Sequence, residues 1–120
     1  MSEFTDHLVE TFAALGAVRA RRMFGGHGLY LDGVMFGLVV DDVLYLKADA
    51  QTLPRFAELG LPCFEYARNG RTVQVSYHRA PDEVLESPDA ASQWGRLALA
   101  AALRAARPAK ARRPRGQSAG

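Results

Sequence analysis

The sequence has little cysteine and no long hydrophobic run. Cys63 is the only cysteine among 120 residues, so neither an internal disulfide nor a cysteine-rich zinc site can form. Every apolar stretch falls far short of the roughly 20 residues that a membrane-spanning helix needs. The first ten residues, MSEFTDHLVE, are acidic and amphipathic, unlike a secretory signal peptide. We therefore expect a cytoplasmic protein with no membrane association.

An excess of one charge sign is confined to one segment. The net charge is +2, and residues 108–120 contain no acid and four cations: Lys110, Arg112, Arg113 and Arg115. Removing these four charges from +2 leaves −2 on the rest of the chain. We predict one domain over residues 1–107 and a disordered basic tail over 108–120. The tail would attract the phosphates of nucleic acid weakly and without sequence preference.

Familiar catalytic and metal-binding patterns are also absent. The histidines His7, His27 and His78 have no second histidine at metal-ligand spacing. The glycine-rich segment MFGGHGLYLDG, residues 23–33, precedes a strand pattern and lacks the Lys-Ser or Lys-Thr of a phosphate loop. We predict no enzyme activity, no catalytic residue, no metal site and no cofactor. The alternative is a small enzyme or ligand-binding domain that uses the Gly25–Gly28 bend with His27. We favour a small buried hydrophobe as the role of Cys63 and leave its pairing with His27 as an open alternative.

Periodicity and turn residues predict a single α+β domain. Asp32-Gly33, Asp41-Asp42 and Asn69-Gly70 each indicate a hairpin turn between two strand patterns. The order is α-β4-α-β2-α, in one mainly antiparallel sheet. The expected elements are a helix ending before Gly16, strands at 18–23, 27–31, 34–40 and 43–47, a helix at 53–59, strands at 63–68 and 72–77, and a helix at 88–106.

Cations and aromatic residues recur along the predicted strands. The cations are Arg19, Arg21, Arg22, Arg68, Arg71 and Arg79, and the aromatic residues are Phe24, Tyr30, Tyr45, Phe64, Tyr66 and Tyr77. If the strands are neighbours, the arginines form a basic patch, although we favour a solvated sheet face. The rings suit a platform on which bases stack, although we favour a place in the core. Similarly, we expect Leu53, Phe56 and Leu59 to share one face of their helix.

Two longer segments resemble a known family. Residues 21–49, RRMFGGHGLYLDGVMFGLVVDDVLYLKAD, are similar to the signature of the TfoX N-terminal domain, found in the TfoX/Sxy regulators of bacterial competence. Residues 64–94, FEYARNGRTVQVSYHRAPDEVLESPDAASQW, resemble the second half of that domain. The resemblance covers about residues 4–106. Its signature falls on Arg22, Met23, Phe24, Gly25, Gly26, Gly28 and Tyr30, which we interpret as a structural bend that also presents a partner surface.

The resemblance implies a fold similar to the type III secretion chaperones, and by analogy a homodimer. It implies no catalytic residue and no cofactor. Full-length regulators of this family act at promoters with a cyclic-AMP receptor protein and carry a second, helix-hairpin-helix domain, whereas residues after 106 offer only the basic tail. We therefore expect a non-catalytic regulatory domain that assists transcription through a protein or DNA partner.

Overall fold

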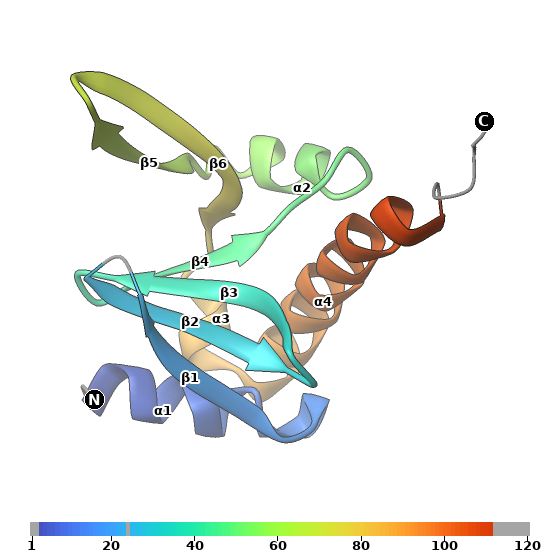
Figure 1. The fold of residues 1–120 in the computed structure, drawn as a ribbon. Coiled ribbons are helices and arrows are strands. Elements are labelled where there is room, and N and C mark those ends of the chain that lie inside the picture. The colour runs from blue at the N-terminus through green and yellow to red at the C-terminus, as the bar shows by residue number, and fades with distance from the viewer. Residues whose placement is uncertain (1–2, 24, 112–120) are drawn as a thin grey trace.

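The computed structural model describes residues 3–23 and 25–111, with side chains up to residue 106. Six strands form one antiparallel sheet in the order β1-β2-β3-β4-β6-β5 (Figure 1). The strands are β1 (Val18–Met23), β2 (Gly26–Leu31), β3 (Val34–Val40), β4 (Val43–Lys47), β5 (Cys63–Arg68) and β6 (Arg71–Arg79). The helices are α1 (Glu3–Thr11), η1 (Ala13–Leu15), α2 (Leu53–Glu58), α3 (Glu83–Glu86) and α4 (Pro88–Ala111). The α+β class predicted from the sequence is confirmed. Within the described residues, no helix is both long and apolar enough to cross a bilayer.

Three tight turns fold the chain into its hairpins. Both central residues of each turn have positive φ, as in Asp32 (51°) with Gly33 (80°) and Asn69 (53°) with Gly70 (77°). This is the requirement of a type I′ turn, whose twist matches that of the flanking strands. Asp41 and Asp42 adopt the same region, with φ of 53° and 59°, because a short polar side chain tolerates it. The turn chemistry therefore places the strand ends beside these turns within one residue of the sequence predictions.

A bulge in β3 determines which of its side chains enter the core. Leu29 is opposite Gly37 and Tyr30 is opposite Met35, so Phe36 has no partner on β2. Phe36 is fully buried and meets Phe12 edge-on, with 5.5 Å between the ring centroids. Met35 consequently points to the opposite face. One extra residue thus lets β3 supply the core while leaving a methionine on the other side of the sheet.

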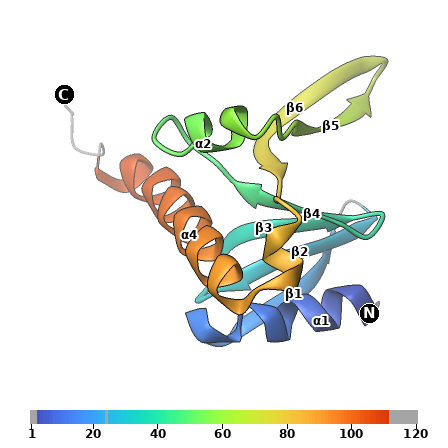
Figure 2. The same ribbon diagram turned by 180° about the vertical axis from the view of Figure 1, so that it is seen from behind.

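All the long helical packing lies on one face of the sheet. Viewed from behind, α1 and α4 cross this face, and α3 connects β6 to α4 (Figure 2). Small buried residues of α4, Ala91, Ala98 and Ala101, allow its backbone to approach the strands. Trp94 packs on Phe56, and its Nε1 donates a hydrogen bond to Glu83. The core therefore sits between the sheet and α1, α2 and α4.

The helices differ from the sequence predictions in four details. The first helix ends at Thr11, and a separate 3-10 helix, η1, follows it to Leu15. The short helix α3 was not expected. Ser87 caps α4, since its Oγ accepts a hydrogen bond from Ala90 N at 3.2 Å. α4 continues to Ala111, past the expected end at residue 106, because its alanine-rich sequence favours helix. Leu53 and Leu59 are 43% and 53% exposed, so Phe56 alone anchors α2, which is too short to bury a full stripe.

Asp49 connects the loop before α2 to α4. Its carboxylate accepts hydrogen bonds from the backbone amides of Gln51 and Thr52 and from the Arg104 guanidinium, at 2.6 and 3.0 Å for the latter. The Arg104 guanidinium lowers the pKa of Asp49 below its ordinary value. One carboxylate therefore both shapes the loop and holds α4 beside it.

Candidate functional site

The glycine segment serves chain geometry at two positions. A Cβ on Gly26 would fall on the Val39 carbonyl oxygen, so only glycine allows β2 to approach β3 here. A Cβ on Gly28 would instead meet the sulfur atoms of Met35 and Met23 at 2.6 and 2.7 Å. Gly28 therefore provides the space in which two methionines and the neighbouring Tyr30 ring converge. Both glycines lie within β2, and the interpretation of the whole segment as a structural bend stays a prediction, with Phe24 outside the described residues.

The signature residues divide between the two faces of the sheet. Met23 and Tyr30 lie together on the face that the helices leave uncovered, and the Tyr30 hydroxyl lies 3.7 Å from the Met23 sulfur. Arg22 is exposed and pairs in register with His27, so it belongs to the opposite face. Our expectation that the signature presents a single partner surface remains a prediction.

We call the uncovered side of the sheet the open face and define it by strand alternation and register. A continuous register row crosses five strands, from Arg21 through Gly28, Leu38 and Tyr45 to Arg79. The face comprises Arg19, Arg21, Met23, Gly28, Tyr30, Met35, Leu38, Tyr45, Lys47, Phe64, Tyr66, Arg68, Arg71, Val73, Val75, Tyr77 and Arg79.

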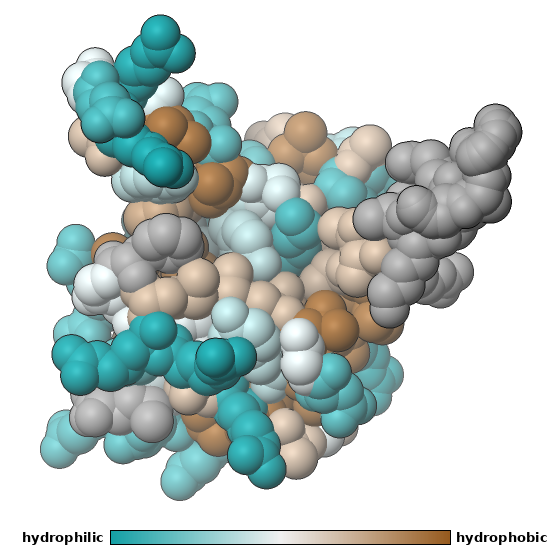
Figure 3. Space-filling model, viewed as in Figure 1, coloured by the Kyte–Doolittle hydropathy of each residue, from teal (hydrophilic) through white to brown (hydrophobic). Residues whose placement is uncertain are grey.

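Strands β5 and β6 form one side of this face and project beyond the other four strands. Only Tyr77, His78 and Arg79 of β6 pair with β4, so the remainder of the hairpin extends beyond the sheet (Figure 1). Figure 3 shows hydrophilic side chains at the hairpin and along the β1 edge, with a hollow and less polar surface between them. The open face is therefore concave, with polar margins and an apolar floor.

Aromatic rings form the floor of the open face. Tyr45 meets Phe64 with 5.0 Å between ring centroids, and Phe64 stacks on Tyr66 at 6.2 Å. All three rings are only half-buried and lie outside the helix-covered core. The expectation that the strand aromatics belong to the core is thus wrong for these rings, because the helices cover only the other face. The Tyr77 hydroxyl donates to the Met35 carbonyl oxygen at 3.0 Å, and burial raises the pKa of Tyr77 to about 12.

Every charged side chain on the open face is a cation. Arg21 lies over the Tyr30 ring and Lys47 over the Tyr77 ring, at 5.3 and 5.2 Å from the centroids. Burial lowers the pKa of Lys47 from its ordinary value. Arg79 lies 3.8 Å from Asp82, an exposed pair that contributes little. The acids lie elsewhere, at turns, on helices or, like Glu65, on the opposite face of the hairpin. The arginines considered from the sequence, apart from Arg22, therefore lie on this face, but toward its two sides and not in one patch.

The proposed partners of the alternative enzyme site do not meet. His27 is on β2 and Cys63 is on β5, and three strands separate them, which corresponds to about 19 Å at ordinary strand spacing. The Nδ1 atom of His27 instead lies 3.3 Å from the hydroxyl of Thr5, which is fully buried. Cys63 faces His78 in register, but the His78 ring packs on Phe56 and its Nδ1 lies 3.0 Å from the Leu61 carbonyl oxygen. The pairing of His27 with Cys63 is therefore wrong.

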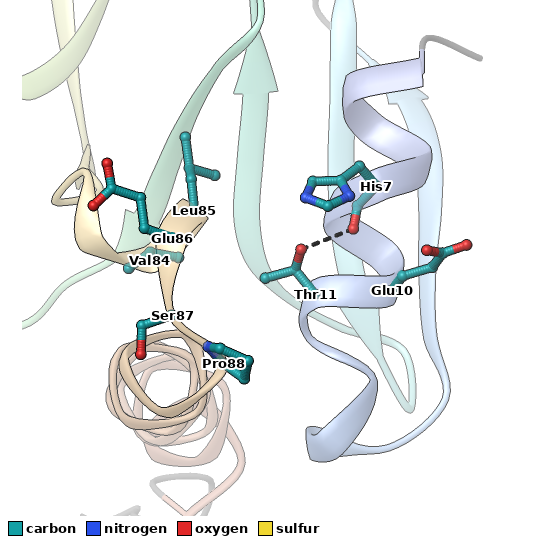
Figure 4. Close-up of a pocket in the computed structure, with 8 residues that line it drawn as sticks. All are labelled: His7, Glu10, Thr11, Val84, Leu85, Glu86, Ser87 and Pro88. Atoms are coloured by element: carbon teal, nitrogen blue, oxygen red, sulfur yellow. Dashed lines mark hydrogen bonds between the residues drawn. The ribbon is translucent and has the colours of Figure 1, made fainter.

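A separate shallow pocket of about 340 Å³ lies between α1 and α3 (Figure 4). Its polar groups include His7, Glu10 and Glu86, and the Thr11 hydroxyl in it donates to the His7 carbonyl oxygen at 2.9 Å. Across the part of the chain that the structure describes, no three His, Cys, Asp or Glu side chains gather closely enough to hold a metal ion. This pocket thus offers no metal chemistry.

Sequence reasoning missed several members of the open face. Met35, Leu38 and Lys47 were not singled out, and strand alternation could have placed Leu38 and Lys47 with Tyr45. Met35 depends on the bulge, which no local signal announces. Conversely, the tail cations Lys110, Arg112, Arg113 and Arg115 lie outside the described side chains, and their contacts with nucleic acid stay a prediction.

The sequence is similar to two curated proteins. It is 34% identical over 77 residues to DNA transformation protein TfoX1 of Aliivibrio fischeri. The matched segment covers 64% of this chain and 37% of that protein. It is 28% identical over 95 residues to Protein Sxy of Escherichia coli, covering 79% and 46% respectively. The chain therefore spans less than half the length of these relatives. Residues 10–102, which include the sheet and most of α4, match the TfoX N-terminal domain, and the chain belongs to that family.

Proposed function

We propose that this chain is a non-catalytic regulatory module in the control of DNA transformation, and that it acts by holding a partner on its open face. The family membership supports the regulatory role, because one relative is named a DNA transformation protein. A single observation carries the interaction role. The helices leave one concave face of the sheet uncovered, and all the charged side chains on that face are cations. A regulator of transcription works in the cytoplasm, which is the compartment we propose.

The partner belongs to one of two classes. The family resemblance points to a transcription regulator of the cyclic-AMP receptor type, and the cations point to nucleic acid. In either case we propose that the chain binds its partner and does not transform it. A homodimer, expected by analogy with secretion chaperones, remains part of this proposal.

A genetic experiment tests the regulatory role. The gene is deleted in its own host and restored with the wild type, with Arg68→Ala/Arg71→Ala, or with Arg55→Ala/Arg96→Ala. The control pair removes two exposed cations from α2 and α4, on the helical side. We expect deletion to lower the transcripts of DNA-uptake genes and the transformation frequency, and only the open-face variant to fail in restoring them. Unchanged transcripts after deletion would contradict the proposal.

A further inference from the structure

The charge of the open face selects an anionic partner. Four of its arginines, Arg19, Arg21, Arg68 and Arg71, form no ion pair with any described residue. They stand in two groups, on the β1 edge and at the tip of the β5–β6 hairpin, with Lys47 and Arg79 between. A cationic surface that spans the whole sheet suits a ligand that carries several negative charges in a row. A single small anion would not extend across it.

The floor between the cations selects for exposed planar groups. The rings of Tyr45, Phe64 and Tyr66 follow one another from β4 to the hairpin, at 5.0 and 6.2 Å between centroids. Aromatic side chains of this kind stack on bases without sequence preference. In a duplex the bases are already stacked and paired inside, so only its phosphates would reach this face. A polyglutamate-like peptide has carboxylates but no rings.

The two observations together identify one class of ligand, and the inference rests on the regulatory function proposed above. We propose that the open face binds single-stranded nucleic acid, with phosphates at the arginines of β1 and the hairpin and bases against the Tyr45–Phe64–Tyr66 rings. The ligand crosses the strands from the β1 edge to the hairpin. This site is distinct from the basic tail, whose four cations are outside the described side chains.

Fluorescence anisotropy with the full chain and a labelled 20-nucleotide oligothymidylate tests the proposal. Its competitors are a duplex of equal length and polyglutamate. The open-face variant is Arg68→Ala/Arg71→Ala, and Arg55→Ala/Arg96→Ala is the control with the same loss of charge. A third variant replaces the tail cations Lys110, Arg112, Arg113 and Arg115 by glutamine. Thermal unfolding verifies that each variant is folded, which we expect because all four substituted arginines are exposed.

The open-face variant should bind the oligonucleotide about tenfold more weakly at low salt. Its plot of log affinity against log salt should be shallower by about 1.4, since each lost contact with a single strand removes about 0.7. The control and tail variants should change affinity by less than threefold. Equal losses in the open-face and control variants, or a loss confined to the tail variant, would overturn the proposal.

A ring variant separates stacking from charge. Tyr66→Leu keeps an apolar side chain but removes the stacking surface, so affinity should fall about fivefold while the salt slope stays unchanged. Stronger binding of the duplex or of polyglutamate than of the oligothymidylate would overturn the proposal. If the oligonucleotide does not bind but the open-face variant still fails in the genetic experiment, the regulatory function stands and the occupant of this face is a protein.

Discussion

Gly26 is a position in β2 where a side chain has no room. A Cβ there would fall on the carbonyl oxygen of Val39, which is a backbone atom and cannot move without breaking strand pairing. We expect Gly26→Ala to lower the free energy of unfolding by about 3 kcal/mol, the upper part of the range for overpacking. Urea denaturation of the two proteins measures this difference.

Gly28→Ala is the matched control for Gly26→Ala. It makes the same chemical change in the same strand, but the new methyl group meets the ends of flexible methionine side chains. We expect a loss of about 1 kcal/mol, because these chains can rotate away. If Gly28→Ala proves as costly as Gly26→Ala, the Val39 contact is not what requires glycine at position 26.

At the scale of an element, Asp49 fastens the loop before α2 to α4. The Arg104 guanidinium lowers the pKa of Asp49, so the Asp49 carboxylate binds a proton more tightly in the unfolded chain than in the folded chain. The stabilisation is therefore complete above the unfolded pKa of about 3.9 and is lost as the pH falls through the folded value. Asp49→Asn should be less stable than the wild type at pH 6, and the difference should shrink below about pH 4.

The measurement is the urea midpoint of both proteins between pH 3 and 7. Asparagine retains an oxygen that can accept hydrogen bonds from the Gln51 and Thr52 amides. The difference in stability between Asp49→Asn and the wild type therefore reports the ion pair with Arg104. Glu58→Gln serves as the control for the loss of one negative charge, because Glu58 is exposed and has no ion pair with a described residue. A difference between Asp49→Asn and the wild type that stays constant down to pH 3 would refute the assignment.

The β5–β6 hairpin is the element least supported by the core. None of residues 63–79 is buried, whereas Leu29 of β2 and Phe36 of β3 are fully buried. Regions with little buried surface open at a lower free energy than the global one. We expect amides that pair β5 with β6 to exchange with deuterium at least tenfold faster than those that pair β2 with β3. Equal protection would mean that the hairpin unfolds only with the whole domain.

Elements were predictable from the sequence where the signal is local. Asp32-Gly33 and Asn69-Gly70 mark their turns because positive φ is required there, and the strand positions follow from them. The face to which a side chain points was less predictable. The bulge that sends Phe36 into the core and Met35 to the open face depends on pairing with β2, which is not visible in β3 alone.

The arrangement of the whole sheet was the least predictable feature. The four strands β1 to β4 and the β5–β6 hairpin can join in several orders, and only the pairing of β4 with β6 places Arg79 beside Tyr45. Whether the tyrosines become core or surface depends in turn on which face the helices cover. The types of residue in the candidate site could therefore be predicted from the sequence. Their arrangement on one face could be seen only in the tertiary structure.

At the scale of the whole molecule, the strands of the open face carry no acid, although Asp82 lies beside Arg79. α1 carries Asp6 and Glu10, both exposed, on the helical side, while the strand residues of the open face include no acid. Asp6 and Glu10 line one surface pocket with Arg19 and Arg21, and salt screens such exposed charges over about 10 Å at 0.1 M. Asp6→Asn/Glu10→Gln should therefore raise the affinity for oligothymidylate only about twofold at low salt, with no effect at 0.5 M.

Arg68→Ala/Arg71→Ala changes the net charge by the same amount in the opposite direction, yet should lower the affinity about tenfold because it removes direct phosphate contacts. Effects of equal size in the two variants would show that net charge, and not the placement of arginines on this face, governs binding.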